Sequence, residues 1–180
     1  MSFKTDEPKK TIITERLVLG QLSIENHDFI FELVNTQGWI EFIGDKKIYS
    51  TADATAYIQK INATKNIYWT VKLKDTRAYI GLITFIKRDY LPHYDLGFAF
   101  LPNFNSKGYG YESTKGVLTY LKENKAIETI LAISKPNNTR SIHLLQKLGF
   151  QYEKEVKNGN VTLHVYEASI AGLNSLKKSK

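Results

Sequence analysis

A short polar loop with two glycines stands where a predicted strand ends and a predicted helix begins. It reads Asn105-Ser106-Lys107-Gly108-Tyr109-Gly110 and follows an apolar run that ends at Leu101-Pro102. The first N–H groups of a helix lack acceptors within the helix and carry the positive end of its dipole, so they suit an anion. Gly108 and Gly110 have no Cβ to keep a bulky group away from the backbone, and Lys107 adds a cation. The loop could therefore hold a diphosphate, although a simple turn would use the same residues and the pattern is not a complete G-x-G-x-x-G fingerprint.

A second polar stretch follows the next predicted strand. Here Pro136, Asn137, Asn138 and Ser141 stand at the start of another helical pattern. Plain capping is one explanation, with an asparagine as the N-cap and Ser141 near the first turn. The alternative is that two adjacent strand ends, each leading into a helix, face one cleft, which is a common position for ligands in α/β sheets.

Composition limits the chemistry that is available. The chain has 180 residues, which suits one domain, and its 42% of hydrophobic residues is enough for a core. It contains no cysteine, which excludes disulfides and a cysteine nucleophile and fits a cytoplasmic protein. His93 and His164 stand alone, so we expect no metal site. No apolar run is long enough to span a membrane, and the first ten residues lack the apolar segment of a secretory signal.

The formal net charge is +7, and part of it comes from Lys177, Lys178 and Lys180 in a C-terminal segment without acids. A mildly basic body favours an anionic ligand, although solvated surface explains most such excesses. An RNA-binding protein at the ribosome is one alternative function. It would bind with a steep salt dependence, and the absence of a basic aromatic strip counts against it.

Hydrophobic patterns place both polar stretches within an α/β order. Strands are expected at Ile13–Leu22, Ile67–Lys74, Ala78–Arg88, Tyr94–Pro102, Ile127–Ser134 and, as a hairpin around Asn158-Gly159-Asn160, within Gln151–Ser169. Helices are expected at Ser23–Thr36, Ser50–Thr64, Gly108–Asn124 and Asn137–Phe150. The order predicts a mixed, mostly antiparallel sheet of about seven strands with helices on both faces, and one parallel pair within Tyr94–Ile133.

In this order and spacing, the segments resemble the GNAT acetyltransferase superfamily, and within it the RimJ/RimL-like branch that acetylates the N-termini of ribosomal proteins. The loop 105–110 stands where the family has Q/R-x-x-G-x-G/A. The other similar segments are "TERLVL" at Thr14–Leu19, "DLGFAFLP" at Asp95–Pro102, Glu112 in "GYGYES", and "NNTRSIHLLQKLGF" at Asn137–Phe150. The resemblance covers about residues 12–168. It implies a single N-acetyltransferase domain over residues 1–180, with an ordered core of about 11–170 and a central splay in the sheet.

The resemblance also implies acetyl-coenzyme A as cosubstrate. Its pyrophosphate is expected on Asn105, Ser106, Lys107, Gly108, Tyr109 and Gly110. Its pantetheine arm is expected to pair with Phe98, Ala99 and Phe100, where two strands splay apart, with Asn138 bonded to the arm and Ser141 near the thioester sulfur. The acceptor is then a primary amine, either a protein N-terminus such as that of a ribosomal protein or a small molecule such as an antibiotic, polyamine or amino acid. A deep acidic pocket would favour polyamines and a wide groove a peptide, and the sequence leaves both a monomer and a homodimer open.

Two residues are candidates for proton transfer. Asp95 opens its strand where the branch often has an acid, which makes it the candidate base, unless it is a solvated strand-end carboxylate. Leu145 stands where many members carry a tyrosine acid, so Ser141 is the candidate donor to the leaving thiolate, unless its hydroxyl only starts the helix.

Other positions bear on how far the resemblance holds. Asn105 is shorter than the family's glutamine or arginine, and Lys107 could compensate for the missing phosphate contact. Glu112 is expected to support the loop rather than to catalyse. Trp39 and Phe42 either wall the acceptor pocket or belong to the core. With the changes at Asn105 and Leu145, a non-catalytic coenzyme A-binding module is a second alternative function.

Overall fold

The computed structural model describes residues 11–123 and 127–172. In chain order its elements are β1 (Ile12–Ile13), β2 (Leu17–Gln21), η1 (Ile24–Asn26), α1 (His27–Val34), α2 (Gln37–Phe42), α3 (Thr51–Asn62), β3 (Ile67–Leu73), β4 (Tyr79–Lys87), β5 (Tyr94–Phe100), η2 (Pro102–Phe104), α4 (Tyr109–Glu123), β6 (Thr129–Ser134), α5 (Thr139–Lys147), β7 (Gln151–Asn158) and β8 (Val161–Ser169). The strands form one sheet in the order β1-β2-β3-β4-β5-β6-β8-β7. Every pairing is antiparallel except that of β5 with β6, so the predicted fold class and parallel pair are confirmed.

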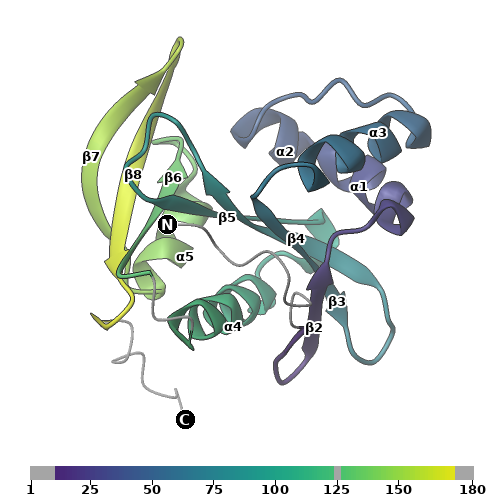
Figure 1. The fold of residues 1–180 in the computed structure, drawn as a ribbon, viewed down its shortest axis with the longest axis horizontal. Coiled ribbons are helices and arrows are strands. Elements are labelled where there is room, and N and C mark those ends of the chain that lie inside the picture. Colours follow the sequence, from purple (N-terminus) through teal and green to yellow (C-terminus); the bar gives the residue numbers. More distant parts are fainter. Residues whose placement is uncertain (1–10, 124–126, 173–180) are drawn as a thin grey trace.

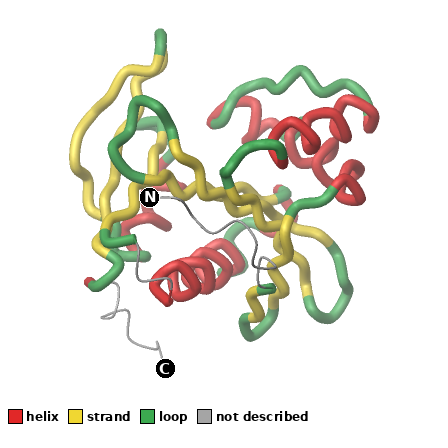
Figure 2. The backbone as a smooth tube through the Cα atoms, viewed as in Figure 1, coloured by secondary structure: helices red, strands yellow, loops and turns green. Residues whose placement is uncertain are grey.

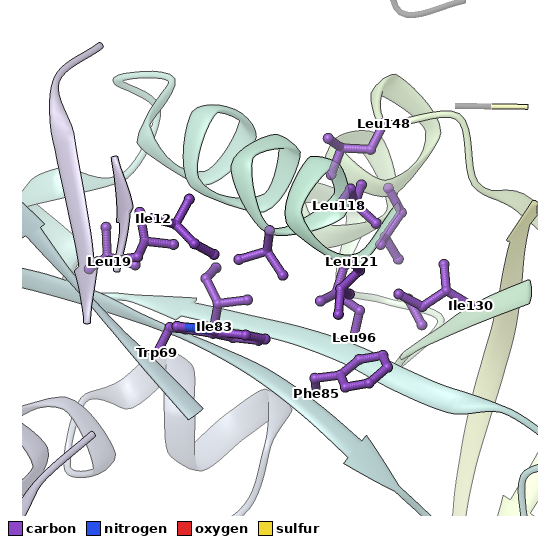
Figure 3. Close-up of a cluster of buried hydrophobic side chains, with 14 of the residues drawn as sticks. Ile12, Leu19, Trp69, Ile83, Phe85, Leu96, Leu118, Leu121, Ile130 and Leu148 are labelled. Carbon is purple, nitrogen blue, oxygen red and sulfur yellow. The ribbon is translucent and has the colours of Figure 1, made fainter. Parts of the chain in front are cut away.

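Helices cover both faces of this sheet. Figures 1 and 2 show α1, α2 and α3 grouped on one side and α4 on the other. On the α4 side, Leu118 and Leu121 pack over Ile83 and Leu96 of the central strands, as Figure 3 shows, and this core also includes Leu145 of α5. A second core joins the first three helices to β4, with Leu33, Trp39, Ile58 and Leu82 among its buried members.

The N-terminal segment differs from the prediction. One strand was expected over Ile13–Leu22, but the chain turns back after Ile13 and β1 pairs antiparallel with β2. The turn is closed by Thr14, whose N–H donates to the Leu17 carbonyl at 3.0 Å and whose hydroxyl accepts from the Leu17 N–H at 3.2 Å. A hydroxyl that bonds the nearby backbone favours a turn over continued strand, and the sheet therefore has eight strands rather than about seven.

Helix α2 was not predicted as a separate helix. It begins after Thr36, whose side chain accepts from the Trp39 N–H at 3.3 Å. By contrast, the predicted cap of α3 is confirmed, because the Ser50 hydroxyl accepts from the Asp53 N–H at 3.1 Å. Both predicted hairpins are also present, and each turns through a residue of positive φ, Arg77 at 63° and Gly159 at 60°.

Lys177, Lys178 and Lys180, and the first ten residues, lie outside the described part of the chain. Within residues 11–123 and 127–172, none of the helices has the length and hydropathy that a membrane crossing requires.

Candidate active site

The sheet divides between β5 and β6. On one side, β5 pairs with β4 along its whole length, from Tyr94 to Phe100. On the other side it pairs with β6 at a single position, Asp95 with Leu131. Beyond that point the outer edge of β5 at Phe98, Ala99 and Phe100 has no strand partner in the described chain. The predicted splay is therefore present, and it leaves backbone groups available to an extended ligand.

Asp95 lies where the two strands separate, and its side chain is only 2% exposed. One carboxylate oxygen, Oδ2, accepts from Nε of Arg88 at 2.6 Å, and Oδ1 accepts from the Ile133 N–H at 3.2 Å. Burial raises the pKa of Asp95 above its ordinary value, while Arg88 and the Ile133 N–H oppose that rise. The residue is thus not the solvated strand-end carboxylate that the sequence left open.

The first turn of α4 has free N–H groups. Glu112 is the first residue whose N–H is satisfied, by the Gly108 carbonyl at 3.0 Å. Those of Tyr109, Gly110 and Tyr111 have no acceptor among the described residues. Before them, Ser106 and Gly108 adopt positive φ, 61° and 82°. Alternation of left- and right-handed backbone makes successive N–H groups converge on an anion, so this helix start can receive a phosphate group.

A cluster of charged groups fixes the loop from behind. The Glu112 carboxylate accepts from the Thr14 hydroxyl at 2.6 Å and from both N and Nε of Arg16 at 2.7 Å. Arg16 also donates through Nη1 to the Lys107 carbonyl at 3.1 Å and lies over the Tyr109 ring. Burial alone would raise the pKa of Glu112, but the bonds from Thr14 and Arg16 and the Arg16 charge hold it below the ordinary value. Through these contacts Glu112 holds Arg16 against the loop, which agrees with the supporting role that we expected of it.

The start of α5 faces the same gap. Asn138 caps the helix, because its Oδ1 accepts from the Ser141 N–H at 3.2 Å. Neither the Asn138 amide nitrogen nor the Ser141 hydroxyl has a partner among the described residues. Asn138 therefore caps α5, and its amide nitrogen and the Ser141 hydroxyl still remain available to a ligand.

Two cavities meet at the splay. The first, which we call the loop cavity, has a volume of about 730 Å³. Its walls include most of the residues predicted to bind the coenzyme: Phe98, Ala99, Phe100, Asn105, Ser106, Gly108, Gly110, Asn138 and Ser141. Lys107 and Tyr109 are not among its walls. The Lys107 ammonium lies over the Phe104 ring, and the Tyr109 ring lies under Arg16.

The second, the sheet cavity, has a volume of about 450 Å³ and lies over β4, β5 and β6. Asp95, Leu145 and Tyr68 are among its walls. The two cavities have seven wall residues in common: Trp39, Phe42, Ile43, Phe98, Ala99, Asn138 and Ser141. Trp39 is buried in the core, as one of the two expectations had it, and it also lines both cavities.

Several wall residues were missed from the sequence. Arg140 and Lys147 of α5 line the loop cavity, and Lys46 and Arg88 line the sheet cavity. The basic positions of α5 could have been found, because residues seven positions apart, about two turns, lie on one face of a helix. Lys46 and Arg88 come from distant loops and carried no local signal. Among the described residues, no three histidine, aspartate or glutamate side chains gather to hold a metal ion.

Comparison with known proteins gives consistent matches. The model of the acetyltransferase (GNAT) domain matches residues 16–151. The uncharacterized N-acetyltransferase YnaD of Bacillus subtilis (strain 168) is 26% identical over 153 residues, which cover 83% of this chain and 89% of that protein.

Two solved structures have the same fold. Ribosomal-protein-S5-alanine acetyltransferase from Vibrio fischeri aligns with a TM-score of 0.75 and 14% identity over 94% of this chain and 100% of its own. Spermidine N-acetyltransferase from Vibrio cholerae, solved with CoA and spermine, aligns with a TM-score of 0.74 and 17% identity over 88% of this chain and 98% of its own.

Proposed function

The chain belongs to the GNAT acetyltransferase family and is an acetyl-coenzyme A-dependent acetyltransferase, and we propose that it acetylates a primary amine by direct attack in a ternary complex. One observation carries the proposal. The loop cavity and the sheet cavity share the walls Phe98, Ala99, Asn138 and Ser141, so ligands bound in the two cavities can meet at these residues. The coenzyme occupies the loop cavity and the amine occupies the sheet cavity.

The loop cavity suits the coenzyme along its length. Three unsatisfied N–H groups at the start of α4 bind the pyrophosphate, and each hydrogen bond to a charged group contributes about 1.5–3 kcal/mol. Arg140 and Lys147 add positive charge in the place that the sequence gave to Lys107. The pantetheine amides pair with the open edge at Phe98–Phe100, as an added strand does.

Positioning supplies much of the rate in this scheme. Holding amine and thioester in attack geometry can offset ~7–11 kcal/mol of the barrier. A free backbone N–H of β5 stabilises the oxyanion as the carbonyl is attacked. The thiolate is a good leaving group, since an alkyl thiol is far more acidic than an alcohol and that of a cysteine side chain has a reference pKa of ~8.5. Ser141, whose hydroxyl has no partner among the described residues and lines both cavities, is the proposed proton donor.

Asp95 is the proposed base. It lines the sheet cavity, and burial raises the pKa of its carboxyl toward the range in which a base is effective. Both of its oxygens accept from protein donors, so it takes the amine proton through a water molecule rather than by direct contact. Its second task is to hold Arg88 and Ile133, so a substitution at Asp95 affects both proton transfer and the position of Arg88.

An acetylation assay tests the proposal. The protein is incubated with acetyl-coenzyme A and a panel of amines: peptides with free N-termini, the twenty common amino acids, spermidine and aminoglycosides. Free thiol and acetylated product are measured separately. Product from at least one amine, at a rate above that of hydrolysis, is the expected result. Tight coenzyme binding without acetylation of any amine would instead support the non-catalytic coenzyme A-binding module.

A further inference from the structure

The charged residues on the walls of the sheet cavity are Lys46, Arg88, Lys135 and Asp95. The one carboxylate is already paired, because Asp95 accepts from Arg88 at 2.6 Å. Lys135 donates to the backbone carbonyl of Glu41. Lys46 has neither a hydrogen bond nor an ion pair with any described residue. The cavity thus presents an excess of positive charge, the opposite of the acidic pocket that a polyamine requires.

Arg88 is held in a geometry that suits a carboxylate. Its Nε bonds to Asp95, whose burial fixes the position of the guanidinium, and 32% of the Arg88 side chain remains exposed. Nη1 and Nη2 have no hydrogen-bond partner in the described chain. These two nitrogens form the end-on fork that binds a carboxylate with two parallel hydrogen bonds. The ion pair with Asp95 therefore fixes the guanidinium through Nε and leaves Nη1 and Nη2 of Arg88 available to a ligand.

Apart from Asp95, whose charge is paired with Arg88, the described walls carry no negative charge to repel an anion, and several of them are hydrogen-bond donors. Tyr57 and Tyr68 line the cavity, and burial raises the pKa of both phenols, that of Tyr57 to about 12. The buried indole Nε1 of Trp39 has no partner among the described residues. Lys46 is on the surface, but desolvation lowers its pKa, and the Arg88 charge lowers it further. A bound anion would relieve the repulsion between these two cations.

We infer that the acceptor is an amine that carries its own carboxylate, an amino acid or a short peptide, and that Arg88 and Lys46 bind this carboxylate. The inference rests on the proposed function and names the substrate class of its acceptor site. A cavity of about 450 Å³ is large enough for such a molecule. The same cations favour the neutral form of the amine, because nearby positive charge disfavours an ammonium ion. Binding and deprotonation are thus served by one arrangement of charge.

Matched acceptors test the inference. The amino acid that is acetylated fastest is compared with its amide and with its decarboxylated amine, which differ from it only at the carboxylate. We expect kcat/KM to fall at least tenfold for both. Equal kcat/KM for the three, or a preference for spermidine, overturns the inference and leaves the acetyltransferase proposal intact.

Variants identify the residues. Lys46→Gln should lower kcat/KM for the amino acid at least fivefold more than it lowers that for the amide, which has the same amine but no carboxylate. Lys47→Gln removes the same charge from the neighbouring residue, which does not line the cavity, and should change neither. Arg88→Gln should act as Lys46→Gln does and more strongly, but it also leaves Asp95 without its partner. If Arg88→Gln is poorly folded, the result for Lys46→Gln alone decides whether these cations bind the carboxylate. A Lys46→Gln enzyme with wild-type preference for the carboxylate overturns the assignment.

A binding measurement decides the matter if no amine is acetylated. Calorimetry with coenzyme A present compares the N-acetyl forms of the twenty amino acids with those of their amides. Binding at least tenfold tighter for a carboxylate than for its amide, weakened by Lys46→Gln, supports an anion-binding acceptor site even though the transfer proposal has failed. Equal binding of the N-acetyl amino acids and their amides, or no binding of either, overturns the anion-binding acceptor site.

Discussion

Gly108→Glu tests the proposed pyrophosphate site most directly. Gly108 has φ of +82°, and a Cβ at this position would lie 3.2 Å from Nη2 of Arg16. An L-residue with positive φ costs about 1–2 kcal/mol. The new carboxylate would also stand beside the three free N–H groups at the start of α4. Two negative charges about 6 Å apart repel by about 3 kcal/mol at an effective dielectric of ~20, and that corresponds to about a hundredfold weaker coenzyme A binding.

The assay is titration calorimetry with coenzyme A and, separately, with pantetheine, which lacks the pyrophosphate. We expect the loss to be confined to coenzyme A. Gly108→Ala introduces the backbone strain without the charge and should weaken binding far less. Gly159→Glu places the same side chain at another glycine of positive φ, where a Cβ meets nothing within 4 Å, and should leave affinity unchanged. Coenzyme A affinity within threefold of wild type in a folded Gly108→Glu protein would refute the loop assignment.

Three further substitutions separate the roles of single side chains. Asp95→Asn should lower the acetylation rate at limiting amine at least tenfold and leave coenzyme affinity intact; a rate within about twofold, less than ~0.4 kcal/mol in the barrier, excludes Asp95 as the base. Ser141→Ala should lower kcat about tenfold, since the thiolate leaves with little help, and a change in coenzyme affinity alone would make Ser141 a binding residue. The folded-state pKa of Glu112 is below its ordinary value of 4.5. Ionised Glu112 therefore contributes stability that is fully present above about pH 4.5 and is lost as pH falls through the lowered pKa. Glu112→Gln should lower the free energy of unfolding by about 2 kcal/mol at pH 7, and denaturant titrations should show this difference shrinking below pH 4; a constant difference contradicts the assigned contacts.

Local patterns were sufficient for most of the fold. The helix at Thr51–Asn62 and the hairpin turning through Gly159 follow from a capping serine and a glycine turn, because each depends on residues close in sequence. The turn at Thr14 was missed because its hydroxyl could equally belong to a strand that continues, and its bond to Glu112 is a contact between residues 98 positions apart. Short segments such as Gln37–Phe42 are ambiguous for a different reason, because a helix of six residues is too short to show a clear periodicity.

The candidate site was predictable where it follows chain segments and not where it is assembled across them. The glycine loop, the edge of β5 and the start of α5 are contiguous stretches with their own signatures, and all three line the loop cavity. The side chain of Lys107 was assigned to that cavity from its position in the loop, yet it lies over Phe104, because sequence position does not fix the direction of a long side chain. Lys46 and Arg88 approach each other only through the packing of helices on the sheet, so no spacing in the sequence could have paired them.

The contacts of Asp95 connect the open edge of β5 to the sheet cavity. Ile133 follows two residues after Leu131, so its N–H faces β5 and would donate to a β5 carbonyl if the parallel ladder continued. It donates instead to Asp95 Oδ1, and the side chain thereby takes the place of main chain at the point where the strands part. The other oxygen of the same carboxylate orients Arg88. One buried residue thus ends the ladder, which leaves the edge of β5 without a strand partner among the described residues, and holds Arg88 on the wall of the sheet cavity. Asparagine at this position retains an acceptor for Ile133 but loses the charge that holds Arg88, so Asp95→Asn should preserve the slot for the coenzyme while it loosens the grip on a carboxylate.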